Sequence, residues 1–411
     1  QVKTAVLDPR FRLSAANLIC QVILMMTIPV YSRVFTVAEF GQTSVYLFFI
    51  QILSTAAALR YDLALLNAKT DAVAAQLVRL ACALILGISS LVLAIVTAWY
   101  FVYPDSSVTT ANLFLVPAGI LMISLFTLLN YWFTRENAFS LMSGARIFQT
   151  IVGAVAPLII YPMGYGVAAL VIGAFLARSL GLFIYLAAFG RMRRMSILMV
   201  KGRRAPLGKI ARKYSSFPMY SAPQVFINTA AIAIGPVIMT TLGDQGLGGQ
   251  MWTADRIMLS GIAVFGVSFG QVLLGQLKGT SEAHQMKDTV LRSHVSLLKF
   301  GPAIVIFIGL ALFVFSQEIL GQEWKAAGTI ALMLVFPAIA QLLSSPLSVI
   351  VGLLDKNREN LIFHSIALIL RVVPFAILCV VNVDIAIPVY ATITTAIYVV
   401  YLSYLLRIAD I

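Results

Sequence analysis

The sequence predicts an all-α polytopic membrane protein with about 12 transmembrane helices. Of its 411 residues, 60% are hydrophobic and only 11% are charged, whereas a soluble domain is about half apolar and about a quarter charged. Roughly a dozen apolar stretches have the ~20 residues that a helix needs to cross a ~30 Å hydrocarbon core. None of these stretches shows the alternating ~10-residue pattern of a membrane β-barrel.

Hydropathy, together with turn residues and charges, places these helices along the chain. The expected helices are 13–33, 40–59, 77–102, 112–133, 140–162, 165–189, 217–242, 250–275, 293–315, 327–352, 361–381 and 385–406. We therefore expect an N-terminal six-helix bundle at 1–190, a basic cytoplasmic linker at 191–213 and a C-terminal six-helix bundle at 214–411.

The polar segment between the two bundles orients the protein. It carries nine basic residues and no acid: Arg191, Arg193, Arg194, Lys201, Arg203, Arg204, Lys209, Arg212 and Lys213. Because Lys and Arg accumulate in cytoplasmic loops, this segment and both termini are expected in the cytoplasm. The net charge of +13 then reports membrane topology and implies no nucleic-acid partner. Trp99 and Trp324 fall at outer helix ends, where aromatic anchors at the membrane interface are expected.

An internal repeat divides the chain near its middle. The stretch "SAANLICQVILMMTIPV" (14–30) matches "SAPQVFINTAAIAIGPV" (221–237) in its first and last two residues. Further along the chain, Gly41-Gln42 corresponds to Gly249-Gln250. The triplets Arg135-Glu136-Asn137 and Arg358-Glu359-Asn360 follow the fourth and tenth helices. Each half has an even number of helices, so the two copies lie parallel in the membrane.

Amide side chains recur at equivalent positions of the first and seventh helices. Asn17 and Gln21 correspond to Gln224 and Asn228, and each pair lies with a serine on one helical face. Parallel repeats usually frame a central pathway. We therefore expect these four amides to line a substrate-binding cavity between the halves. The alternative is that they only join packed helices by hydrogen bonds.

Several arginines lie inside predicted helices. At ~1.5 Å per residue, Arg178 and Arg371 fall near the bilayer midplane, and Arg256 lies about a turn and a half below an outer helix end. A central charge costs ~2.5–3.5 kcal/mol on insertion scales. The only acid well inside a predicted helix is Asp255. This positive surplus predicts a water-filled cavity that receives an anion, because Arg binds phosphate through paired hydrogen bonds.

These cations could also be satisfied locally, without any ligand. Arg178 and Arg371 could pair with helix carbonyls, and Arg256 could be compensated by its neighbour Asp255. Arg146 and Lys299 lie nearer the cytoplasmic side and could extend to the interface.

The stretch "AALRYDLALL" (57–66) places Arg60 and Asp62 at the inner end of the second helix. Water is within reach there, so they can be a solvated pair at the membrane boundary. The functional alternative makes Arg60 the cytoplasmic mouth of the positive pathway.

The sequence lacks the motifs of several enzyme classes. No Walker A motif is present, and the 190–213 segment is too short for an ATPase domain. His284, His294 and His364 are scattered and form no HExxH motif. The outer loops are too short to hold a catalytic domain. We therefore expect a transporter without enzymatic activity or a bound metal.

Three long stretches resemble bacterial O-antigen (Wzx-type) polysaccharide flippases. They are "PVYSRVFTVAEFGQTSVYLFFIQILSTAAALRYDLALL" (29–66), "ARKYSSFPMYSAPQVFINTAAIAIGPVIMTTLG" (211–243) and "GQEWKAAGTIALMLVFPAIAQLLSSPLSVIVG" (321–352). The similarity covers nearly the whole chain, and its motifs are degenerate, so they indicate a family and not a substrate. That family belongs to the multidrug/oligosaccharidyl-lipid/polysaccharide (MOP) exporter superfamily.

This resemblance implies a V-shaped pair of six-helix bundles that works by alternating access. It implies movement of an undecaprenyl-pyrophosphate-linked oligosaccharide, an O-antigen or exopolysaccharide repeat unit, from the cytoplasmic to the periplasmic leaflet of the bacterial inner membrane. Such a flippase serves lipopolysaccharide biosynthesis, beside a polysaccharide polymerase and a chain-length regulator, and we expect it to be a monomer. The family's cationic lumen maps onto Arg33, Arg60, Arg256 and Arg371.

Two alternative functions belong to other classes of membrane protein. A multidrug or small-solute antiporter of the same fold would use an interior acid, and Asp255 is the candidate residue for coupling to Na⁺ or H⁺. No other cofactor is expected. A membrane-bound polymerase of the same pathway would be expected to carry a large outer loop, which the sequence lacks.

Overall fold

The computed structural model describes residues 9–102, 113–191, 207–258, 283–348, 351 and 356–408, and every regular element in these ranges is helical. The chain divides by its contacts into two compact units. Unit 1 comprises Gln1–Leu24 and Tyr46–Ala230, and unit 2 comprises Met25–Val45 and Ala231–Ile411.

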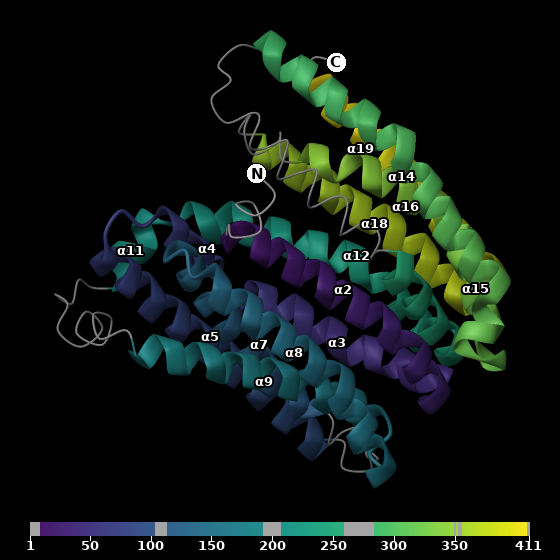
Figure 1. Ribbon diagram of the computed structural model, residues 1–411, viewed down its shortest axis with the longest axis horizontal. Coiled ribbons are helices and arrows are strands. Elements are labelled where there is room, and N and C mark those ends of the chain that lie inside the picture. Colours follow the sequence, from purple (N-terminus) through teal and green to yellow (C-terminus); the bar gives the residue numbers. More distant parts are fainter. Residues whose placement is uncertain are drawn as a thin grey trace. The chain divides into compact units, whose positions relative to one another are not determined.

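Unit 1 is built on helices that pack against one another along their lengths. Its elements are the first part of α2 (Pro9–Val34), most of α3 (Val37–Ala57), α4 (Tyr61–Ala64), α5 (Asp71–Val102), α7 (Leu115–Arg135), α8 (Phe139–Ile160), α9 (Val167–Arg191), α11 (Leu207–Lys213) and the start of α12 (Ala222–Leu242). The helices α7, α8 and α9 lie side by side (Figure 1).

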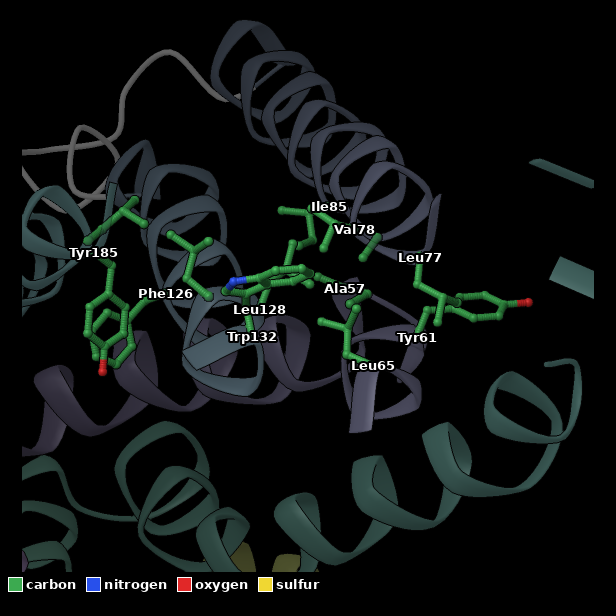
Figure 2. Packing of buried hydrophobic residues seen from close by; sticks show 14 of the residues in the cluster. Ala57, Tyr61, Leu65, Leu77, Val78, Ile85, Phe126, Leu128, Trp132 and Tyr185 are labelled. Carbon is green, nitrogen blue, oxygen red and sulfur yellow. The ribbon is translucent and has the colours of Figure 1, made fainter. Parts of the chain in front are cut away.

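Large aromatic side chains fill the core of unit 1. Trp132 is 1% exposed, and its ring lies among aliphatic side chains of neighbouring helices (Figure 2). The rings of Phe126 and Tyr185 stack with their centroids 4.8 Å apart, and the Tyr185 hydroxyl donates to Asn130 Oδ1 at 3.0 Å. Burial of such large side chains stabilises the core of unit 1.

Unit 2 holds the rest of α2, α3 and α12 together with the later helices. These are the helical residues 245–258, α14 (Ala283–Leu320), α15 (Lys325–Met333), α16 (Val335–Ser344), α18 (Asn357–Val381) and α19 (Val383–Ile408). The helices α15 and α16 form a pair that bends by 48° at a short break. Pro337 explains the break, because its ring clashes with the carbonyl four residues earlier and it donates no hydrogen bond.

The helices confirm the predicted fold class. In the described residues, nine helices are long and apolar enough to cross a membrane, or ten if the bent α15–α16 pair counts as one span. The predicted helix 40–59 exists as α3, although its polar residues keep it out of that count. The predicted helix 250–275 lies outside the described residues beyond residue 258. The exact number of twelve spans therefore stays a prediction.

An aromatic cluster explains why Met25–Val45 groups with unit 2. The Trp324 indole N–H donates to the Ser32 carbonyl at 2.9 Å, and its ring meets that of Phe40 edge-on at 4.9 Å. With 1% exposure, Trp324 is a core residue, so the interpretation of it as an interfacial anchor was wrong. Trp99, which is 54% exposed, is accessible as an anchor should be. The predicted domain boundaries at residues 190 and 214 differ from the boundaries of the two units. The two pseudo-symmetric six-helix bundles stay a prediction.

The repeated glycines meet where α3 crosses the helical residues 245–258. A methyl group added to Gly249 would lie 1.8 Å from the Val37 carbonyl oxygen and 2.8 Å from the Gly41 nitrogen. A methyl group added to Gly41 would lie 2.3 Å from the Gln245 carbonyl oxygen. Small residues allow membrane helices to approach closely, and at this crossing there is no room for a larger residue than glycine, so the two repeated glycines form one contact in unit 2.

We expect Gly249→Ala to destabilise the protein by about 1–3 kcal/mol, because the backbones must separate to admit the methyl group. Thermal unfolding of the detergent-purified protein measures the loss. The control is Gly87→Ala in α5, where nothing lies within 4 Å of the added methyl group. Equal melting temperatures for the two variants would contradict the close crossing.

Candidate functional site

Arg371 lies in the middle of α18, fourteen residues after its first residue, Asn357. Its side chain is buried at 3% exposure. One terminal nitrogen donates a hydrogen bond to the Ala231 carbonyl of α12. The guanidinium carbon lies 5.4 Å from the centre of the Tyr398 ring in α19. Arg371 therefore connects three helices of unit 2, as expected for a buried guanidinium paired with a helix carbonyl.

A small cavity opens beside this guanidinium, entirely within unit 2. Its volume is about 30 Å³, enough for one or two water molecules. Its polar lining comprises Asp255, Gln341, Arg371, Tyr390, Thr394 and Tyr398, and its apolar lining Ile232, Met258, Leu334, Pro337 and Ala338. The structure thus brings together two of the predicted site residues, Asp255 and Arg371.

The break between α15 and α16 forms one wall of the cavity. Leu334 at the break and Pro337 and Gln341 after it all line the space. A straight helix would continue its close packing here, whereas the bend opens room for polar side chains. The local sequence "LVFPAIAQ" (334–341) thus positions the wall of the site.

Arg256 follows Asp255 in the sequence but occupies a different environment. It is exposed, and its guanidinium carbon lies 5.1 Å from the centre of the Trp252 ring. Adjacent residues on a helix do not share a face. Asp255 lines the cavity with Arg371, so the interpretation that it locally compensates Arg256 is not supported by this geometry.

Arg33 has a structural partner at the end of another helix. Its guanidinium donates to the Glu318 carbonyl at 2.9 Å, two residues before α14 ends at Leu320. Basic side chains commonly satisfy the last carbonyls of a helix in this way. The contact accounts for Arg33 as a helix cap, and a lumenal role for it stays a prediction.

Half-buried Arg60 and buried Asp62 lie at a strained turn in unit 1. Arg60 has φ 62° and follows Leu59 with φ 47°, a conformation that costs non-glycine residues energy. Asp62 is 4% exposed and accepts a hydrogen bond from the Leu63 N–H at 2.9 Å. Burial raises the pKa of the Asp62 carboxyl, and the Arg60 guanidinium opposes that shift. Asp62 is therefore buried and not solvated, whereas the place of the two residues at the membrane boundary stays a prediction.

The remaining predicted site residues are distributed over unit 1. Arg178 lies half-buried in α9. Asn17, Gln21 and Gln224 are half-buried, and Asn228 is exposed. All four amides belong to unit 1, as do Arg60 and Arg178, whereas Arg33, Asp255, Arg256 and Arg371 belong to unit 2. Arg146 and Lys299 are exposed, as their extension towards an interface requires.

Several polar residues that complete the cavity were not predicted from the sequence. Tyr390, Thr394 and Tyr398 recur every four residues and so follow one face of α19. A polar stripe on an otherwise apolar helix was the available signal. Gln341, a polar residue within the apolar helix α16, was a second such signal. In the described residues, no group of three or more His, Cys, Asp or Glu side chains could hold a metal ion.

Comparison with known proteins identifies the fold. No protein-family model and no curated protein matches the sequence. The solved lipid II flippase MurJ, in an inward closed conformation, is similar with a TM-score of 0.69 and 15% identity over 96% of this chain and 87% of that one. A multidrug resistance MATE transporter in its inward-facing conformation also gives 0.69, at 13% identity over 96% and 99%.

A third similar structure is a MOP superfamily transporter from Pyrococcus furiosus, described as having a binding pocket of reverse polarity. It gives a TM-score of 0.62 at 14% identity over 98% of this chain and 96% of that one. These likenesses show that the chain has the exporter fold of the MOP proteins, which confirms the predicted fold class. They do not distinguish flippases from multidrug transporters.

We expect Arg371→Met to destabilise the protein by roughly 2–4 kcal/mol, because it leaves the Ala231 carbonyl and the Asp255 carboxyl without their cationic neighbour. Thermal unfolding of purified variants measures the effect. Arg256→Met, which removes an exposed charge, should cost under about 1 kcal/mol. In the double variant Arg371→Met/Asp255→Asn the two losses should be less than additive. Full additivity would show that the two side chains do not interact.

Proposed function

We propose that this protein is a transporter that moves an undecaprenyl-pyrophosphate-linked oligosaccharide from the cytoplasmic to the periplasmic leaflet. The observation that carries the proposal is the surplus of arginine in membrane helices. In unit 2, Asp255 shares its cavity with Arg371. Among the described residues, no carboxylate forms an ion pair with the exposed Arg256. An exposed guanidinium within a membrane protein suits an anionic head group.

The chemistry of the polar residues supports the proposed substrate class. A pyrophosphate carries several acceptor oxygens that match a guanidinium. The amides Asn17, Gln21, Gln224 and Asn228 can exchange hydrogen bonds with sugar hydroxyls. The similarity to a lipid II flippase supports a lipid-linked glycan as cargo. Arg178 and Arg60 are proposed as further cationic positions along the pathway in unit 1.

The cellular setting is proposed together with the substrate. The protein would lie in the bacterial inner membrane with both termini in the cytoplasm, because its basic linker follows the positive-inside rule. It would act as a monomer without enzymatic activity, beside a polysaccharide polymerase and a chain-length regulator. In this setting it would supply O-antigen or exopolysaccharide repeat units for assembly.

We expect Arg256→Ala to reduce surface polysaccharide at least tenfold, because a lost contact to a charged head group costs about 1.5–3 kcal/mol. Immunoblotting of polysaccharide, normalised to the amount of protein in the membrane, measures the effect. The control is Arg407→Ala, which removes an exposed arginine near the end of α19 and should leave polysaccharide levels unchanged. Normal polysaccharide in the Arg256→Ala strain would remove the main support for the proposal.

A second candidate function is a cation-coupled multidrug or small-solute antiporter. The MATE transporter fits the chain as well as MurJ does, and Asp255 lines a cavity where protonation or ion binding could alternate with substrate. If this function is correct, cells that express the protein extrude a cationic dye and Asp255→Asn abolishes the efflux. Efflux indistinguishable from that of cells without the protein would eliminate this candidate.

A further inference from the structure

The groups around the Arg371 guanidinium are those that bind a cation. The Ala231 carbonyl accepts a hydrogen bond from it, and the Tyr398 ring lies 5.4 Å from it. The carboxylate of Asp255 and the oxygen-bearing side chains of Gln341 and Thr394 line the adjoining cavity. Carboxylate, carbonyl, amide and hydroxyl oxygens are also the ligands that hard metal cations prefer.

The position of Arg371 decides which cation this site contains. Its guanidinium is held in place by contacts to two other helices, α12 and α19. A metal ion in the same small cavity would lie beside a fixed positive charge at low dielectric, where repulsion is strong. Asp255 already has that charge as its neighbour. The residues present therefore do not fit a bound Na⁺ while Arg371 is in place.

We propose that Arg371 is a tethered substitute for a coupling cation, and that the unit 2 cavity becomes a Na⁺ site only when the guanidinium is removed. If Arg371 takes the place of a cation, Na⁺ does not bind at Asp255 during transport. This consequence for ion coupling rests on the proposed transport function. The binding claim depends only on the cavity, so it can be tested on purified protein without a transport assay.

The surroundings of Arg371 also indicate how a cation from solution could replace its guanidinium in a variant. Arg371 Nε is buried without a hydrogen-bond partner, so the guanidinium has unused donor capacity. Replacing it with the shorter, uncharged glutamine would remove the positive charge and add one more side-chain oxygen. The Asp255 carboxylate would then lack a positive neighbour, and a cation from solution would stabilise it.

The test compares thermal unfolding of purified full-length variants in equal concentrations of NaCl, KCl and choline chloride. We expect wild type to melt at the same temperature in all three salts. For Arg371→Gln we expect Na⁺ to raise the melting temperature by about 2–4 °C relative to choline, because a ligand bound only to the folded state stabilises it. Arg371→Gln/Asp255→Asn should lose this Na⁺ effect.

Two further variants separate charge from position. Arg371→Lys keeps a tethered cation and should show no Na⁺ effect. Arg256→Gln removes the adjacent exposed charge, which does not line the cavity, and should show none either. A Na⁺ effect that appears equally in Arg256→Gln would mean that net charge, and not the cavity, controls cation binding, which contradicts the proposal.

The remaining outcomes also decide the question. A folded Arg371→Gln variant without any Na⁺ effect overturns the proposal. So does a Na⁺-specific rise in the wild-type melting temperature that Asp255→Asn removes, and this measurement does not require Arg371→Gln to fold. If the protein does not flip the lipid-linked oligosaccharide but the variants show the predicted Na⁺ effects on melting temperature, the proposed function is refuted and the proposal about the cation site is supported.

Discussion

Arg371 holds a positive charge in the middle of α18, and several neighbouring elements of unit 2 accommodate it. The Ala231 carbonyl and the Tyr398 ring contact the guanidinium directly, while Asp255 lies in the same cavity. The cost of a charge at the centre of a membrane helix, ~2.5–3.5 kcal/mol on insertion scales, is offset by these contacts. The bend at Leu334 provides the room that the polar side chains need.

The contacts of the arginines distinguish two groups that the composition of the sequence does not. Arg371 and Arg33 have carbonyl partners, so they are explained in part by their structural contacts. Arg256 has no carbonyl partner of this kind within the described part of the chain; it is exposed, and its guanidinium carbon lies 5.1 Å from the centre of the Trp252 ring. We therefore propose that recognition of an anionic substrate depends more on Arg256 than on the total count of buried arginines.

Local properties of the sequence predicted most of the fold. Hydropathy located the helices because a run of ~20 apolar residues is a local signal, and α7, α9 and α18 begin and end within a few residues of the prediction. The site needed information that is not local. Asp255 and Arg371 are more than 100 residues apart, and the role of Trp324 depends on Ser32 and Phe40. The repeat also misled in detail, because Asn360 is buried and accepts a hydrogen bond from Tyr401, whereas Asn137 occupies a left-handed turn.

The proposed function requires that the accessible cationic positions bind a pyrophosphate head group. The most direct measurement is the thermal stability of the purified protein with undecaprenyl pyrophosphate, compared with the uncharged alcohol undecaprenol. We predict stabilisation by the pyrophosphate lipid that weakens as salt is added and disappears in Arg256→Ala. Equal stabilisation by both lipids, unaffected by salt or by the variant, would show that only the hydrocarbon tail is recognised and would contradict the proposed function.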